Sequence, residues 1–490
     1  MGWGDRIAQA IRRWLKLQPP WSQSTITIRE PYSYETDVIR NRIWYRGDAD
    51  ELHQLYGQLR DAGAGGSRFW AAVPSGRTIR KMHTGLPGVM VDTLVSIVMS
   101  DYDGMDFGVG NEIQAAAWEE LEGATEFLTS AELGLAETLV TGGGAWRVCW
   151  DTGVTPYPWL EFYGEDRIQR HRTGGISFYT DYEVSNQVYQ LEELREMGNI
   201  RYILRDSQGE PVPLDTVPTL SGLEDIALGV DMPMAVPLQI WPSTRWRGRG
   251  RSIFSGKTDD FDALDEVASQ WMDAIRCGRV QRYIPEDLMP RNRETGEPMP
   301  IDDFGANYIK LRQSLRGEDG DDGKIETAQA KIDYSAFSSS YSSVLDMCLH
   351  GILSPASLGI NIAADASGAA KREGKDITGF TRNKITAALE TALPRAAVML
   401  LQMYDWLCDR PMQRYAPTLS FGEYAAPDFN ARVEAVRNAA ACGAMSIEAQ
   451  VTELWGGSKG DAWISEEIRR IKRDKGITEE EEDGAGDELP

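Results

Sequence analysis

The fold of this chain is decided by residues 258–277, TDDFDALDEVASQWMDAIRC. Apolar residues recur there at the spacing of one helical face, which predicts an amphipathic α-helix about 30 Å long. Thr258 is a candidate N-cap, and the two acids that follow it suit the positive end of the helix dipole. The apolar face consists of Phe261, Leu264, Val267, Ala268, Trp271, Met272 and Ile275.

The opposite face of the same helix is acidic. It carries Asp262, Asp265, Glu266 and Asp273. Because like charges repel, we expect that this face does not grip nucleic acid tightly.

Outward from this helix, the sequence predicts an α+β fold that is mostly helical. On the N-terminal side, helices are expected over 48–61, 86–99 and 111–140, strands over 146–150, 159–163, 176–184 and 200–205, and loop over 207–237. On the C-terminal side, we expect short strands near 279–284 and 307–312, a helix over 334–351, a long helix ending near 408 with a kink or restart at Pro394, and a strand over 418–421. Three short helices follow, over 428–442, 446–455 and 465–475.

Length and composition set broad limits on the protein. A chain of 490 residues predicts about two to four domains, and 42% hydrophobic residues exclude wholesale disorder. No apolar run approaches the roughly 18 residues of a membrane helix, and we expect no secretory signal. Five scattered cysteines favour free thiols and a reducing compartment. The formal net charge of −24 would repel DNA over most of the surface.

The sequence lacks the common catalytic and ligand-binding motifs. The four histidines lie outside any HExxH pattern, and no GxSxG elbow occurs. Gly256-Lys257-Thr258 resembles the end of a phosphate loop, but Arg251 stands where that loop needs glycine. The glycines at 142–144 precede a strand instead of a helix. We therefore expect no enzyme activity, no cofactor and no metal site.

Two basic segments leave alternatives open. Residues 3–17 predict a basic amphipathic helix, which would bind a membrane surface or a partner groove, or pack on its own domain. The second segment is either a solvated linker that pairs with nearby acids or a contact to DNA or to an acidic face of a neighbouring subunit. It contains Arg245, Arg247, Arg249, Arg251 and Lys257.

Several separated stretches resemble one family, the portal proteins of tailed bacteriophages of the Gram-positive-phage type. The run Trp44-Tyr45-Arg46-Gly47-Asp48, followed by Leu52 and Tyr56, resembles the family's opening motif. Residues 86–95 are similar to the segment entering its wing domain, and residues 141–151 to the Gly-rich turn into the wing sheet. Asp428, Ala440, Gly443, Ser446 and the helix 466–475 resemble its helical crown.

The order of the central elements also resembles the stem, clip, stem, tunnel loop and tunnel helix of that family. The resemblance implies a wing over 35–257, a stem helix over 258–278, a clip over 279–330, a second stem helix over 331–353, a tunnel loop over 354–370, a tunnel helix and wing return over 371–427 and a crown over 428–478. The sequence departs from the family at its two ends, where composition predicts a basic arm over 1–34 and an acidic disordered tail over 479–490.

The resemblance implies a ring, typically of twelve subunits, at one capsid vertex. Such a head-to-tail connector conducts double-stranded DNA during packaging and ejection. It docks the packaging motor (the large terminase subunit) and head-completion or adaptor proteins, and meets major capsid and scaffolding proteins. The implied location is the virion, and the host cytoplasm during assembly. Rival hypotheses are a nucleotide-dependent packaging enzyme and a peripheral membrane or scaffold protein.

The same resemblance implies roles for particular residues. The stem acids Asp262, Asp265, Glu266 and Asp273 would line the channel and keep the duplex centred and mobile. Arg291 and Arg293 would belong to the clip's docking surface. In the tunnel loop and at its end, the DNA-facing candidates are Asn361, Asp365, Ser367, Lys371 and Arg372.

Overall fold

The computed structural model describes residues 33–63, 68–72, 79–278, 281–285, 292, 295–296, 307–311, 326–328, 331–360, 368–422, 429–456 and 461–476. The expected basic helix over 3–17 and the acidic tail over 479–490 lie outside the described residues. The chain divides into two compact units, one ending at Phe421 and the other beginning at Gly422. None of the described helices is both long enough and apolar enough to cross a membrane.

The WYRGD stretch forms the junction between two helices, α2 (Tyr34–Arg46) and α3 (Ala49–Asp61). Trp44 is fully buried in the core. Gly47 ends α2 with a φ of 73°, which glycine adopts without strain. Asp48 begins α3, since its carboxylate accepts hydrogen bonds from two backbone N–H groups of the first turn at 2.8 and 3.1 Å. Trp44, Gly47 and Asp48 of the motif therefore each have a structural role.

Four more helices surround the main hydrophobic core of the first unit. They are α4 (Leu86–Met99), α5 (Glu112–Ala124), α6 (Phe127–Thr141) and α9 (Gly368–Leu407). Their fully buried residues interlock in one cluster that includes Leu94, Leu121, Leu135, Leu389 and Leu400. The single helix expected over 111–140 is wrong, because Glu126 has a left-handed φ of 50° that separates α5 from α6.

Two antiparallel sheets lie next to these helices. The three-stranded sheet has the order β10-β2-β3, formed by Ala235–Leu238, Gly144–Cys149 and Trp159–Gly164. The other sheet has the order β4-β5-β6-β7-β8, with β9 also pairing to β7. Its strands are Ile168–Arg170, Ile176–Val184, Gln187–Glu196, Asn199–Arg205, Pro211–Val212 and Ile226–Ala227. The loop expected over 207–237 is therefore wrong in part, because β8, β9 and most of β10 lie in it.

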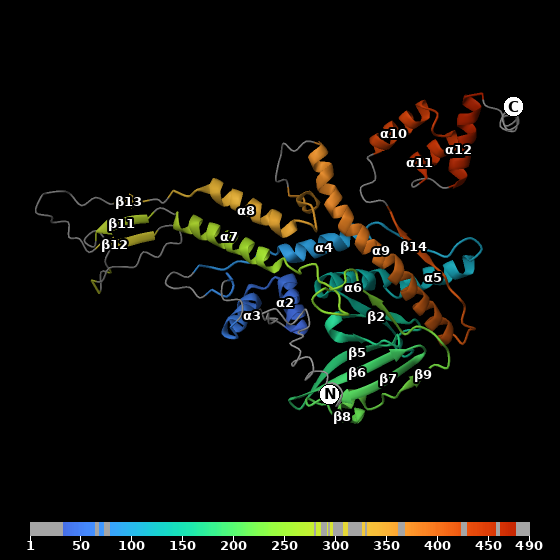
Figure 1. Cartoon of the computed structure of the whole chain (residues 1–490), viewed down its shortest axis with the longest axis horizontal. Helices are drawn as coiled ribbons and strands as arrows, with labels where there is room; N and C mark the ends of the chain where they lie inside the picture. The colour runs from blue at the N-terminus through green and yellow to red at the C-terminus, as the bar shows by residue number, and fades with distance from the viewer. Residues whose placement is uncertain are drawn as a thin grey trace, which may run out of the picture. The chain divides into compact units, whose positions relative to one another are not determined.

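The helix predicted over 258–277 is confirmed as α7 (Thr258–Cys277). Thr258 is its first helical residue and not its cap; Lys257 occupies the cap position and makes no side-chain cap bond. Together with α8 (Tyr334–Leu349), α7 leads to a small sheet, and the two helices lie side by side (Figure 1). That sheet has the order β12-β11-β13, with strands Asn307–Leu311, Gln281–Pro285 and Glu326–Ala328. The pair β11–β12 is parallel and the pair β11–β13 antiparallel.

The long helix expected to end near 408 is confirmed as α9, which spans 40 residues. Pro394 is buried within it, and the helix does not restart there. Beyond α9, the strand β14 (Thr418–Phe421) pairs antiparallel with β1 (Tyr102–Asp106), which places Leu419 opposite Met105. The end of the first unit thus pairs with a strand formed early in the sequence.

The second unit consists of α10 (Phe429–Ala441), α11 (Ile447–Trp455) and α12 (Asp461–Asp474). The three expected helices are confirmed, although α12 begins four residues earlier than predicted. Ser446 caps α11 by accepting a hydrogen bond from the N–H of Ala449 at 3.2 Å.

Candidate functional site

The N-terminal half of α7 is held in place by the carboxylate of Asp265, which is 0% exposed. This carboxylate accepts hydrogen bonds from the backbone N–H of Thr84 at 2.9 Å, from the Thr84 hydroxyl at 3.0 Å and from the indole N–H of Trp70 at 3.1 Å. The Nδ1 atom of His83 lies 2.7 Å from Oδ2 of Asp265, the oxygen that also accepts from Trp70. One acid therefore holds two separate parts of the segment 68–84 against α7.

Asp262, one helical turn earlier, binds the same segment. It accepts hydrogen bonds from the backbone N–H groups of Phe69 at 2.8 Å and Trp70 at 3.2 Å. Burial raises the pKa of Asp262 above its ordinary value, although these two hydrogen bonds oppose the shift.

The expectation that Asp262 and Asp265 form an exposed acidic face is therefore wrong. Both face residues 68–72 and 79–84 of the same chain, which supply their hydrogen-bond donors. Glu266 and Asp273 are half-buried on α7, so these two of the four acids keep access to solvent.

The apolar face of α7 is covered only in part. Phe261 and Leu264 lie in the main core. Farther along, Trp271 contacts α8, where its ring is parallel to that of Phe337 at 6.2 Å and lies 6.3 Å from that of Tyr341. The last members of the face, Met272 and Ile275, are 44% and 37% exposed, so the end of the helix keeps an uncovered apolar surface.

The segment before α9 is anchored at its start. Thr378 of α9 hydrogen bonds the backbone N–H of Ser354 at 2.9 Å and the Ser357 hydroxyl at 3.0 Å. The hydroxyl of Thr381 donates to the carbonyl of Ile352 at 2.7 Å. These contacts hold residues 352–357 against residues 378–381 of α9.

Five more candidate residues lie outside the described residues: Asn361, Asp365 and Ser367, and the arginines expected in the clip, Arg291 and Arg293. Lys371 and Arg372 belong to the backbone of α9, at its N-terminal end.

The basic residues before α7 are of two kinds: some bind other parts of the fold, and others remain open to solvent. Arg249 donates from Nη1 to the carbonyls of Glu165 and Ile168, both at 2.9 Å, and its guanidinium lies 4.8 Å from the Tyr34 ring centroid. Arg251, by contrast, lines a groove of about 440 Å³ beside α9. Arg249 is therefore held within the fold, whereas contact of Arg251 with DNA or with a neighbouring subunit stays a prediction.

Lys257 has a structural role. Its ammonium donates to the carbonyl of Met347 at 2.5 Å and to Asp260 at 3.4 Å, which joins the start of α7 to the end of α8. Because Lys257 is committed to these contacts and Thr258 is helical, the stretch Gly256-Lys257-Thr258 does not form a phosphate loop.

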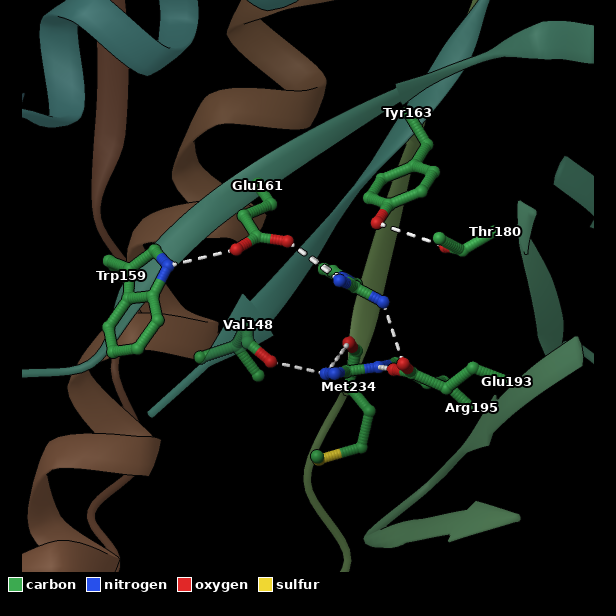
Figure 2. Close-up of polar contacts among 9 residues, drawn as sticks. Val148, Trp159, Glu161, Tyr163, Thr180, Glu193, Arg195 and Met234 are labelled. Atoms are coloured by element: carbon green, nitrogen blue, oxygen red, sulfur yellow. Dashed lines mark hydrogen bonds and ion pairs between the residues drawn. The ribbon is translucent and has the colours of Figure 1, made fainter. Parts of the chain in front are cut away.

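A buried ionic network, which sequence reasoning missed, joins the sheet β10-β2-β3 to the sheet that contains β6 (Figure 2). Arg147 of β2 donates to Glu161 of β3 at 2.7 and 3.1 Å and to Glu193 of β6 at 2.6 Å. Arg195 of β6 contacts Glu193 and donates to the carbonyl of Val148. No single pattern in the sequence could have indicated this network, because its members come from three strands.

The network changes the acid–base properties of its members. Burial alone would raise the pKa of Glu161, but hydrogen bonds and the charge of Arg147 hold that pKa below its ordinary value. Burial raises the pKa of the nearby Cys149 thiol to about 11. Glu161 is therefore ionised and Cys149 is a neutral thiol at pH 7.

Polar clusters elsewhere are also explained by packing. His171 hydrogen bonds the Ser177 hydroxyl at 2.8 Å, and Arg382 of α9 donates twice to Asp101, at 2.7 and 3.0 Å. Within the part of the chain that the structure describes, no three His, Cys, Asp or Glu side chains are grouped so that they would hold a metal ion.

Comparisons with known proteins add little. No protein-family model and no curated protein sequence matches the chain. A chain from the virion of a native gene transfer agent (GTA) particle shares 14% identity, over 72% of this chain and 95% of that one, with a TM-score of 0.30. A chain from the neck of an empty GTA particle, computed with C6 symmetry, shares 11% identity over 74% and 93%, also with a TM-score of 0.30. Such TM-scores are too low to decide the fold or the function.

Proposed function

We propose that this chain is a non-enzymatic portal subunit, one copy in a ring that conducts double-stranded DNA into and out of a viral capsid. The observation that carries the proposal is the arrangement of α7, the small sheet β12-β11-β13, α8 and α9 in one chain. Two helices side by side carry a sheet away from the core, and a segment anchored by Thr378 leads from α8 into a helix of 40 residues.

The uncovered end of the apolar face on α7 supports assembly. Met272 and Ile275 remain exposed after α8 has covered Trp271, so a further apolar surface is needed to bury them. In a cyclic oligomer each such face meets a neighbouring copy. The resemblance implies twelve copies.

A conduit must let DNA pass without holding it. A net charge of −24 suits this task, because it minimises attraction to phosphate over most of the surface. In this proposal Glu266 and Asp273 face the channel, and Lys371 and Arg372 stand where the tunnel loop becomes helix. Arg291 and Arg293 belong to the surface that docks the packaging motor and head-completion proteins.

Electron microscopy of the purified full chain tests the proposal directly. We expect rings with a central hole. The same preparation should hydrolyse no ATP, which separates a passive conduit from a packaging enzyme. A monodisperse monomer in light scattering at micromolar concentration would contradict the proposal.

A further inference from the structure

A large aromatic side chain stands exposed on α9. Phe380 is 74% exposed, whereas the residues of α9 that follow it turn an apolar face into the core. Lys384 lies one turn farther along and is also exposed, so that the two side chains share one face of the helix. An aromatic ring left in water on a rigid helix is typical of an anchor for another molecule.

The groove beside Phe380 is cationic. Its volume is about 440 Å³, and Trp241, Arg251, Lys257 and Lys384 are among the residues that line it. No acid lines it. Among the described residues, Arg251 and Lys384 have no ion-pair partner, while Lys257 is committed to Met347. This surface therefore favours a partner that brings a negative charge.

A second, larger hollow of about 780 Å³ lies where α5 meets α6, against β3. Its lining includes Leu133 and Val154, which are 64% and 79% exposed, and the aromatic side chains of Trp159 and Phe162. Glu126 lines it as well, at the break between the helices, and is exposed. Within the described chain Glu126 has no ion-pair partner. The hollow thus combines apolar and aromatic side chains with several hydroxyl groups. It contains two acids, of which Glu161 is paired with Arg147 and Glu126 is available.

We propose that Phe380 of one copy inserts into this hollow on the next copy of the chain, with Lys384 facing Glu126. The two surfaces match in both respects: an exposed aromatic ring meets an apolar hollow, and an unpaired cation meets an unpaired acid. They share no residue, so one copy uses both at once. Pairing of two different surfaces is what closes a ring of identical subunits. This inference rests on the proposed ring.

Nucleic acid is a poorer occupant of these surfaces. A duplex would satisfy Arg251 and Lys384 but would leave Phe380 exposed, and the acid in the larger hollow repels phosphate. A second copy satisfies the aromatic ring, the cation and the acid together.

Charge exchange provides the first test. The measured quantity is the protein concentration at which half of the rings dissociate. Phe380→Ala and Lys384→Glu should each raise it at least about tenfold, as expected for an anchor at the centre of an interface. Glu126→Lys should do the same, and combining it with Lys384→Glu should restore assembly. Val109→Ala, which truncates an exposed apolar residue that lines neither surface, should leave assembly unchanged. Mass photometry gives the populations, and circular dichroism checks folding.

Cross-linking provides the second test. In a background where the exposed Cys408 and Cys442 are replaced by serine, Phe380→Cys combined with Leu133→Cys should form disulfide-linked ladders of subunits under mild oxidation. Each single variant should give no ladder. This experiment decides the matter even where Phe380→Ala or Lys384→Glu fails to fold.

The outcomes separate the two proposals. The inference would be overturned, and the portal function would stand, if the parent chain forms rings, the double-cysteine variant forms no ladders and Phe380→Ala assembles normally. Restored assembly without ladders would also overturn it, since the residues would then act at a distance. A parent chain that stays monomeric would overturn both.

Discussion

Asp265 and Asp262 stand on the same helix as Glu266 and Asp273, and yet only the first two belong to the core. The difference lies in segment 68–84, which brings backbone N–H groups, an indole and an imidazole to the two buried acids. Trp70 and Asp265 are 195 positions apart in the sequence. Helical periodicity shows which residues share a face, but it says nothing about a distant segment that covers part of that face.

We expect Asp265→Ala to lower the free energy of unfolding by about 3 kcal/mol, because it leaves several buried donors without an acceptor. Chemical denaturation measures the change. Glu266→Ala, on the neighbouring but half-exposed residue, should alter the free energy of unfolding by no more than about 0.5 kcal/mol. Equal effects of the two substitutions would show that Asp265 does not anchor segment 68–84.

Glu161 should make stability depend on pH. The pKa of Glu161 is lowered from 4.5 in the folded state. Ionised Glu161 therefore stabilises the fold at pH values above 4.5, and this contribution is lost as the pH falls through the lowered pKa. The difference in melting temperature between the parent and Glu161→Gln should therefore shrink as the pH falls below 4.5.

The matched control is Glu183→Gln, which removes an exposed carboxylate from β5 that has no ion pair among the described residues. Its melting temperature should follow that of the parent across the same pH range. A Glu161→Gln difference that stays constant with pH would mean that Arg147 does not favour the ionised form.

At the scale of helices and strands, the sequence predicted the long amphipathic elements best. The helices α3, α4, α7 and α9 and the strands β3, β5 and β14 lie within a few residues of their expected positions. Strand β6 was missed because two of its three buried positions are Glu193 and Arg195, which an alternation of apolar residues cannot reveal. Both are buried because they pair with each other, while Arg147 from another sheet also donates to Glu193.

The candidate site was predicted less well than the fold. The sequence identified α7 and the cationic Arg251, but not the groove that Arg251 forms with Lys384, because α9 and the segment before α7 meet only in the folded chain. The sequence does contain Phe380 one helical turn before Lys384, but only the folded chain shows that Phe380 is exposed.

The pair of α7 and α8 should depend on Trp271. Trp271→Ala removes the contacts with Phe337 and Tyr341, and we expect it to lower the free energy of unfolding by about 2 kcal/mol, since the ring is only half-buried. Hydrogen exchange over 334–349 should increase in the same variant. Met272→Ala should change the unfolding of a single copy by no more than about 0.5 kcal/mol and should weaken the ring instead. The reverse pattern would contradict the assignment of the two faces.

For the whole molecule, the proposed conduit predicts that folding and DNA handling can be separated. Lys371→Ala with Arg372→Ala should preserve ring formation and melting temperature, because the proposal places both cations against DNA and not within the fold, where an isolated surface charge contributes little to stability. The double variant should change the length of packaged DNA or the packaging efficiency. In a DNA-binding titration, each lost cation should lower the salt slope by about one per subunit engaged.

Arg172→Ala provides the control, because it removes an exposed arginine from the turn between β4 and β5 and should affect neither property. A lower melting temperature of the double variant with normal packaging would mean that Lys371 and Arg372 hold the ring together, and residues 354–370 would then not be the tunnel loop.

The pairing of β1 with β14 has a consequence for the order of events on the ribosome. Thr418 donates to the carbonyl of Asp106, a residue made 312 positions earlier. At roughly 5–20 residues per second, translation between the two takes about 15–60 s, far longer than a strand needs to pair. During that interval β1 has no partner strand, so its backbone N–H and C=O groups can pair with a strand of another nascent chain. A chain whose synthesis stalls before residue 418 keeps that edge permanently.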